Sequence, residues 1–336
     1  MSKIIVIDPG PLSTVQDLGR FCFQRYGIPQ AGAMDEFALE IANLLVGNER
    51  NEGAIEITSS GFKATFEGNA NIAITGGDLG ATLNDEEIES WQSFLVSSGN
   101  TIKFNRIKKG FRAYLSISGG ISVEKVLKSK STCLAGKFGG FGGRKLRSND
   151  VLSCGGVFNK VKPTKIDVAH FQDYHRKRIR VILGPQKEYF SDGEIDEFFK
   201  ASYILTINSD RMGYRLAGPE LFKESSTELL SEGVATGSIQ ISGDGLPIVM
   251  MVDHQTTGGY PKIANVISID LPTLAQFKAG DELSFEPVSL DLAKKLYIER
   301  ETKIKDLEYD LLDSKSKIYR VLVDGKNFDV EIKEKE

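Results

Sequence analysis

A dense group of polar side chains follows one apolar stretch in the last third of the chain. Residues 246–252 are mostly apolar and predict a buried strand, and the segment Asp253–Tyr260 that comes next carries a carboxylate, an imidazole, an amide, two hydroxyls and a phenol. Two adjacent glycines in this segment allow a ligand to approach the backbone closely. A chain reversal does not need so many kinds of polar group. The segment therefore predicts a binding or catalytic site, against the alternative of a polar loop that caps a core strand.

Three residues in or near this segment have chemistry that suits acid–base catalysis. Asp253 ends an apolar strand, so it is the carboxylate most subject to desolvation, which is a common route to a shifted proton affinity. Glu232 precedes the neighbouring hairpin and could act as a base, and its alternative role is to stabilise a surface turn. Tyr260 adds a phenol. These three are the predicted catalytic residues.

Other residues of the same region are predicted to contact a substrate. Arg211 and Arg215 flank a Met-Gly pair, and a guanidinium can hold a carboxylate through two parallel hydrogen bonds. Ordinary salt bridges to Asp210 or Glu220 are the alternative for these arginines. The remaining predicted contacts are polar residues or glycines: Gln240, Gln255, Thr256, Thr257, Gly258, Gly259 and Lys262.

Short strands and glycine-rich turns must position these groups. The chain has 34 glycines but only 10 prolines among its 336 residues, which favours turns between strands over long helices. Alternating residues 239–242, the turn Asp244–Gly245 and the apolar residues 246–252 predict a hairpin. Asp35 and Gly47 are suited to begin and end a helix. The prediction is a mainly β protein with two β-rich units, short helices and a closed β-barrel.

Composition divides the chain into three segments. Residues 1–165 form an N-terminal β-rich unit and residues 166–289 a C-terminal barrel unit. Residues 290–336 begin with a charged helical stretch that reaches about residue 312, and they end in a hairpin at residues 318–332. This last segment is predicted to be an appended extension.

Charge and cysteine usage exclude several classes of function. A net charge of -4 gives no basis for binding nucleic acid or an anionic membrane, and no apolar run reaches the roughly 20 residues that span a bilayer. Three widely spaced cysteines predict a reducing cytoplasm rather than a disulfide framework. The three histidines lack the spacing of a metal site. None of the five methionines precedes a lysine, so any biotin must arrive on another chain.

Five blocks of sequence resemble a known family. They are residues 8–20, 27–35, 42–48, 209–216 and 253–260. In this order they resemble allophanate hydrolase subunit 2, a family that includes biotin-dependent carboxyltransferase subunits, the C subunit of 5-oxoprolinase and Kip-type antagonist proteins. The resemblance covers about residues 4–288.

The resemblance implies a cyclophilin-like β-barrel and a partner, the subunit 1 (B) protein, that shares the active site. It also implies a third, LamB/YcsF-type (A) subunit, with which the complex opens 5-oxoproline to glutamate and hydrolyses ATP. A fused relative transfers a carboxyl group from carboxybiotin to urea, and both substrates are small planar amides. The expected function is therefore that of the C subunit of an ATP-dependent 5-oxoprolinase, inactive alone.

Three alternatives stay open. The first is biotin-dependent carboxyl transfer to urea or a similar amide, and the second is a non-enzymatic antagonist that binds a kinase-inhibitor partner. The third, prolyl isomerase activity, rests on fold analogy alone, and fold does not carry function. The hairpin at residues 318–332 resembles the opening strands of biotinyl carrier domains but stops before their attachment hairpin.

Overall fold

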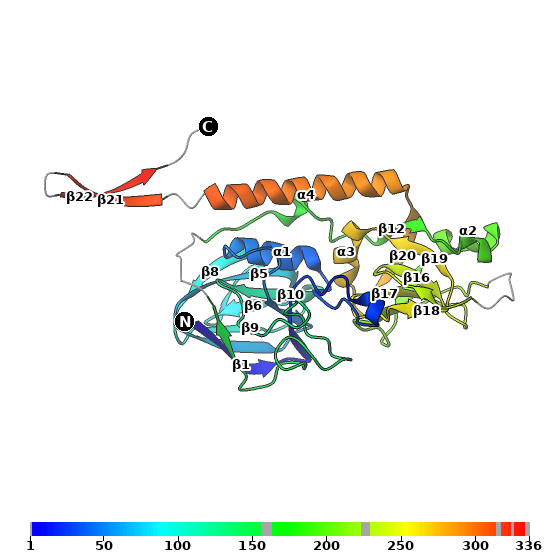
Figure 1. The fold of residues 1–336 in the computed structure, drawn as a ribbon, viewed down its shortest axis with the longest axis horizontal. Coiled ribbons are helices and arrows are strands. Elements are labelled where there is room, and N and C mark those ends of the chain that lie inside the picture. Colours follow the sequence, from blue (N-terminus) through cyan, green and yellow to red (C-terminus); the bar gives the residue numbers. More distant parts are fainter. Residues whose placement is uncertain (1, 156–162, 223–228, 314–316, 324–325, 333–336) are drawn as a thin grey trace.

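Two β-rich units lie side by side, and a long helix crosses above them (Figure 1). The computed structural model describes residues 2–155, 163–222, 229–313, 317–323 and 326–332. Within these residues the fold is mainly β, as the sequence predicted.

The first unit consists of two packed antiparallel sheets. One sheet has the order β11-β1-β4-β9-β6-β7. Its strands are β1 (Ser2–Pro9), β4 (Phe62–Glu67), β6 (Ala81–Leu83), β7 (Glu86–Glu87), β9 (Thr101–Phe104) and β11 (Val151–Cys154). The other sheet has the order β2-β3-β10-β5-β8. Its strands are β2 (Leu12–Gln16), β3 (Ala54–Thr58), β5 (Ala70–Asp78), β8 (Gln92–Val96) and β10 (Lys109–Ile117).

Alternation along the strands explains how the two sheets enclose a core. In β4, Phe62, Ala64 and Phe66 are buried while the residues between them are half-buried, because successive side chains of a strand point to opposite faces. Their apolar faces meet those of β1, β5 and β10 in one continuous cluster.

The second unit is a closed barrel of seven strands in the order β12-β19-β16-β17-β14-β13-β20. The strands are β12 (Arg178–Leu183), β13 (Tyr203–Leu205), β14 (Gly213–Ala217), β16 (Ser238–Ile241), β17 (Pro247–Met250), β19 (Lys262–Val266) and β20 (Glu282–Pro287). The predicted hairpin is confirmed, since β16 and β17 pair antiparallel with Ile241 opposite Pro247. A short pair, β15 (Glu232–Gly233) and β18 (Thr257–Gly258), lies outside the barrel order.

Helices cover the outer surfaces of both units. Helix α1 (Glu36–Leu45) packs on β5 and β10, and the Asp35 carboxylate caps it by accepting the Ala38 N–H at 2.9 Å. Helix α2 (Asp192–Lys200) packs on β20 of the barrel, and α3 (Leu271–Ala275) contacts α1. Single turns of 3₁₀ helix occur at Gln24–Tyr26, Val168–His170, Lys187–Tyr189 and Ser268–Asp270.

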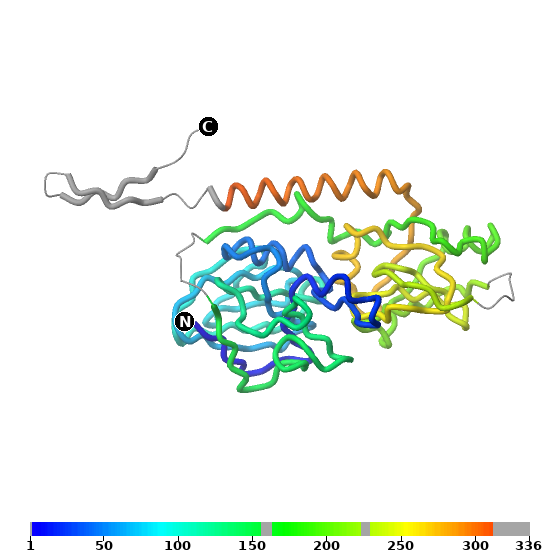
Figure 2. Tube along the Cα trace, viewed as in Figure 1, coloured from blue at the N-terminus to red at the C-terminus, as the bar shows by residue number. Residues whose placement is uncertain are grey.

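The C-terminal helix is docked on the molecule, whereas its charged sequence suggested an appended extension. Helix α4 (Leu290–Asp313) runs back from the barrel across the first unit, with residues 163–177 between them (Figure 2). Ile304 is fully buried among side chains of α1. Beyond α4, the strands β21 (Lys317–Val323) and β22 (Lys326–Ile332) form the predicted hairpin. In the described part of the chain, no helix has the length and apolarity to cross a bilayer.

Candidate active site at the rim of the barrel

The polar segment predicted as a site runs along the rim of the barrel. It leaves β17, passes through β18, and enters β19 at Lys262. The β15–β18 pair fixes its course, because Glu232 lies opposite Gly258 and Gly233 opposite Thr257. The structure thus brings Glu232 together with the second half of the segment Asp253–Tyr260.

An ion pair with an amide partner lies at the centre of this rim. The Nζ of Lys262 is 3.1 Å from Oε2 of Glu232 and 3.2 Å from the carbonyl oxygen of Gly233. The same Oε2 accepts a hydrogen bond of 2.7 Å from the side-chain amide of Gln186. Lys262 is buried, but the Glu232 side chain is 49% exposed. Glu232 can therefore reach a ligand from solvent while Lys262 holds it in place.

The amide of Gln240 lies beside the same strand pair. Its Nε2 donates to the carbonyl oxygen of Tyr260 at 3.2 Å, and its Oε1 is buried without a hydrogen-bond partner in the described structure. A Cβ at position 258 would lie 2.7 Å from Nε2 of Gln240, so only glycine fits there. An unsatisfied buried acceptor is costly and is a place where a ligand donor would be stabilised.

The remaining residues of the segment face outward. Gln255, Thr257 and Gly259 are exposed, and Thr256 is half-buried. The Tyr260 side chain is 47% exposed and lines, with Gly259, a cavity of about 500 Å³. The other walls of this cavity are mostly apolar: Phe190, Leu221, Phe222, Leu229 and Ile241. A planar ligand could lie against these walls with its polar edge towards the rim.

Asp253 and Arg211 lie elsewhere, at the contact between the two units. Nε and Nη2 of Arg211 donate to the two carboxylate oxygens of Asp253 at 2.8 and 3.1 Å. Nη1 of Arg211 contacts Glu56 of β3 at 2.5 Å, and Nη2 also donates to the carbonyl oxygen of Gly32. Burial alone would lower the pKa of Arg211, but Asp253 and Glu56 together raise it above its ordinary value.

This geometry leaves Asp253 with both oxygens engaged by a buried cation. Both side chains are at most 7% exposed. Arg215, the second predicted carboxylate ligand, occupies an exposed position in β14, while Arg211 is buried in the turn before that strand. The two arginines therefore do not form the predicted clamp, because alternate residues of a strand point to opposite faces and Arg215 falls on the outward one.

His254 is buried next to Asp253 and is also engaged. Its Nδ1 lies 2.6 Å from the carbonyl oxygen of Gln255, and its Nε2 lies 3.2 Å from the hydroxyl of Thr236. Burial lowers the pKa of His254, and the Gln255 carbonyl only partly opposes this shift. A neutral imidazole that braces the start of the segment fits these contacts.

Two important residues escaped prediction from the sequence. Gln186 follows β12 with no distinguishing pattern, and its role depends on β15 reaching the same rim. Glu56 did carry a signal, because it is a lone acid between Ile55 and Ile57 in a strand that is buried throughout. A charge in such a position requires a partner, and here that partner is Arg211.

The glycine-rich segment around Gly139–Gly143 does not fit a nucleotide. Its N–H groups bond within the segment: that of Gly143 donates to Gly139 at 2.7 Å, and that of Cys133 donates to Phe138 at 2.9 Å. A phosphate loop needs such groups free and convergent. Among the described residues, no three or more acidic, histidine or cysteine side chains gather as they would around a metal ion.

The fold and the rim define a class of protein, a double sheet joined to a barrel as in carboxyltransferase domains. A model described as "Carboxyltransferase domain, subdomain A and B" matches residues 26–287. The chain belongs to this family, and the resemblance predicted from its sequence blocks is confirmed.

Curated relatives and solved structures agree with this assignment. The chain is 38% identical to the C subunit of 5-oxoprolinase from Haemophilus influenzae over 87% of its own length and 94% of the relative. It is 37% identical to the C subunit of 5-oxoprolinase from Escherichia coli over 91% of itself and 98% of the relative. The structure of Kluyveromyces lactis urea carboxylase superposes with a TM-score of 0.82 at 30% identity, over 91% of this chain and 29% of that one.

Proposed function

We propose that this chain is the C subunit of an ATP-dependent 5-oxoprolinase. The observation that carries the proposal is the match in both directions to relatives of that name, which the chain covers over 94% and 98% of their lengths. A subunit 1 (B) homologue would complete the active site, and a LamB/YcsF-type (A) subunit would complete the enzyme. ATP would act through that complex, and the cytoplasm is the proposed location.

The proposed reaction opens a five-membered lactam. The oxygen of water bonds to the carbonyl carbon, the C–N bond breaks, and the nitrogen gains a proton, which yields glutamate. A group that takes a proton from water and a group that donates to the carbonyl oxygen are needed. At the rim we assign the first role to Glu232 and the second to Lys262.

Glu232 is preferred to Asp253 as the base because of access. Glu232 is half exposed, whereas both oxygens of Asp253 are held by Arg211. In this proposal the free acceptor of Gln240 binds the lactam N–H, and the exposed Thr257 and Tyr260 line the approach. Asp253 then positions the segment and does not touch the substrate.

A reconstitution assay tests the proposal. Glutamate release from 5-oxoproline with ATP would be measured for this chain alone, with the subunit 1 (B) homologue, and with both that homologue and the LamB/YcsF-type protein. We expect turnover only in the full mixture. A tight complex without turnover would refute the oxoprolinase reaction.

A variant pair tests the assigned base. Glu232→Gln should lower kcat by about 10²-fold or more, which is typical for removal of a general base, while the complex still assembles. Glu220→Gln removes an exposed carboxylate from the same unit and should leave kcat unchanged. Equal activity of both variants would contradict the role of Glu232.

Carboxyl transfer to urea is a second candidate, favoured by one specific observation. The chain superposes on Kluyveromyces lactis urea carboxylase along most of its own length. The biotin would arrive in trans on a carrier protein. Adding a biotinylated carrier and urea to the inactive mixture would reveal this reaction, and failure of both assays would favour the non-enzymatic antagonist.

A further inference from the structure

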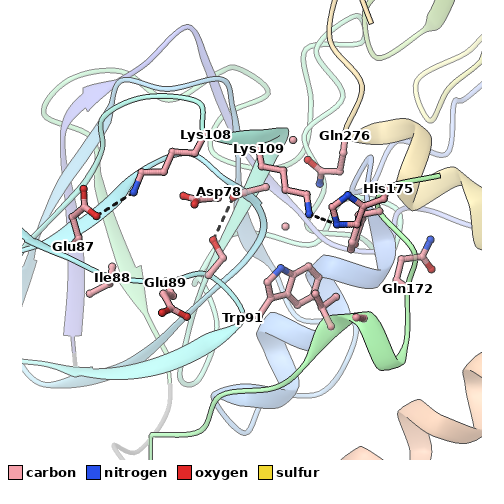
Figure 3. Close-up of a pocket in the computed structure, with 17 residues that line it drawn as sticks. Asp78, Glu87, Ile88, Glu89, Trp91, Lys108, Lys109, Gln172, His175 and Gln276 are labelled. Atoms are coloured by element: carbon pink, nitrogen blue, oxygen red, sulfur yellow. Dashed lines mark hydrogen bonds and ion pairs between the residues drawn. The ribbon is translucent and has the colours of Figure 1, made fainter. Parts of the chain in front are cut away.

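A cavity of about 520 Å³ lies away from the barrel rim (Figure 3). Its walls come from the β5 and β10 ends of the first unit, from residues 168–175, and from Gln276 just after α3. The proposed reaction uses none of these residues. The contents of this cavity therefore need a separate explanation.

Two opposite charges face this cavity without pairing. Asp78 and Lys109 lie directly opposite each other on β5 and β10, a position in which an acid and a base normally attract. Nζ of Lys109 instead lies 2.6 Å from Nε2 of His175. Asp78 accepts a 2.9 Å hydrogen bond from the N–H of Gly80 and has no ion pair within the described residues.

The other charged side chains of the cavity already have partners. Lys108 pairs with Glu87 at 3.2 Å. Glu89 pairs with Lys165. In the view of Figure 3, Asp78 and the two glutamates lie towards one end and Lys109 with His175 towards the other. The cavity thus presents an acid and a base that are separated by open space.

Trp91 forms the wall between these two ends (Figure 3). Its side chain is buried, its ring centroid lies 5.6 Å from that of Tyr174, and its backbone N–H donates to the carbonyl oxygen of Ile74 at 2.6 Å. The backbone of Trp91 has φ of 66°. Such a conformation is unusual and costly for a bulky residue, and it persists where surrounding contacts hold it, often at ligand sites.

A bulge keeps the cavity open. The pairing of β10 with β5 is irregular between Lys109 and Ala113, and Gln276 fills the gap by accepting the N–H groups of Phe111 and Arg112, both at 2.9 Å. A Cβ at Gly110 would lie only 2.7 Å from Oε1 of Gln276. Bulges of this kind re-aim side chains next to functional sites, and this one separates Lys109 from Asp78.

We propose that this cavity binds a free α-amino acid. Its ammonium group would pair with Asp78, its carboxylate would bind Lys109 and His175, and its side chain would lie along the face of Trp91. A molecule that carries only one of the two charges would leave either Asp78 or Lys109 unsatisfied. The proposed ligand is distinct from the proposed substrate at the rim, because 5-oxoproline lacks the ammonium group.

The protein carries its own probe for this site, since Trp91 is the single tryptophan of the chain. Glycine, L-alanine and L-glutamate would be titrated against its fluorescence, with calorimetry as a second measure of binding. N-acetylglycine, glycinamide and 5-oxoproline are the matched probes that lack one charge. We expect saturable binding of the three amino acids and at least about tenfold weaker binding of the three blocked probes.

Variants separate the assigned residues from their neighbours. Asp78→Asn and Lys109→Met should each weaken amino-acid binding by about tenfold or more, because each removes one charge-assisted contact. Lys108→Met is the control, since its exposed pair with Glu87 contributes little, and affinity should change less than about threefold. Circular dichroism would verify that each variant is folded.

Two results would overturn the inference. One is equal affinity for the amino acids and the blocked probes. The other is the absence of calorimetric binding of any amino acid to the folded, unsubstituted chain.

Discussion

The guanidinium of Arg211 is shared by two carboxylates that come from different units. Asp253 follows the barrel strand β17, and Glu56 lies in β3 of the first unit. Desolvating these charges is expensive, and the cost is offset only while all three remain together. At the scale of single residues, this cluster joins the two units and places the start of the rim segment.

Replacement of Arg211 should therefore be a stability defect. Arg211→Met leaves two buried carboxylates without a cation, which we expect to lower the free energy of unfolding by about 3–5 kcal/mol. Urea denaturation would measure this loss. Arg215→Met, at an exposed position in β14, should change stability by less than about 0.5 kcal/mol.

Activity measurements on the same variants distinguish structure from substrate binding. A fully stable Arg211→Met protein that has lost activity would show that Arg211 binds substrate. Asp253→Asn should lose activity, as the sequence predicts, and the structure adds that its stability should fall as well. Normal stability of Asp253→Asn would contradict the structural role of this carboxylate.

Helix α4 shows how an element with a charged sequence can still be anchored. Its Ile304 is fully buried against α1, and Glu301 lies 3.0 Å from Arg50, which also contacts Glu40 of α1 at 3.0 Å. The Nζ of Lys303 donates to the carbonyl oxygen of His170 at 2.8 Å. One apolar contact and a few polar ones therefore hold this helix to the body.

Loss of the buried contact should release α4. Ile304→Ala removes packing worth roughly 2–5 kcal/mol, so limited proteolysis within α4 should become at least about tenfold faster. Ile298→Ala is the matched control, because Ile298 lies in the same helix and is 62% exposed. If both variants are cleaved at the rate of the unsubstituted chain, Ile304 does not anchor the helix.

Element positions were predictable from local patterns, but packing partners were not. The helix capped by Asp35 and the hairpin around Asp244–Gly245 depend on neighbours in sequence, so capping and turn preferences predicted them. The docking of α4 depends on which face of a mostly charged helix meets α1. That choice is a tertiary interaction, and the periodicity of one helix does not contain it.

On the scale of the whole molecule, one buried carboxylate connects all three parts. Asp35 begins α1, and its Oδ2 accepts hydrogen bonds from Tyr174 at 2.8 Å and from Gln276 at 2.7 Å. These partners belong to the segment between the units and to the barrel unit. Burial raises the pKa of Asp35 to about 6, although its hydrogen bonds oppose this shift.

This raised pKa predicts a pH dependence of stability. Between pH of about 4 and about 6 the folded state retains a proton that the unfolded chain releases, so the free energy of unfolding falls as the pH rises through this range. The loss attributable to Asp35 is on the order of 3 kcal/mol at about 1.4 kcal/mol per pKa unit.

Asp35→Asn isolates this contribution, because asparagine can still cap α1. The stability difference between the unsubstituted chain and this variant should shift against the unsubstituted chain as the pH rises from about 4 to about 6, measured by denaturation at each pH. Asp306→Asn controls for removal of one exposed carboxylate. A difference that is constant with pH would show that Asp35 does not titrate in this range.

The barrel-containing, mainly β architecture was predictable because strand and turn patterns recur along the chain. The rim pair of Glu232 and Lys262 was also among the predicted residues, but their contact with Gln186 was not. Separation of Asp253 from the rim could not be predicted either. It depends on Glu56, which is distant in sequence and approaches only when the two units pack.

Each unit closes on itself at adjoining strands. In the first unit β1 pairs with β11, so Ser2 lies opposite Cys154, and in the barrel the first strand β12 lies beside the last strand β20. The backbone thus enters and leaves each unit without threading its core. Such a module tolerates covalent fusion at either end, which makes it equally suited to exist as a separate polypeptide or within a longer one.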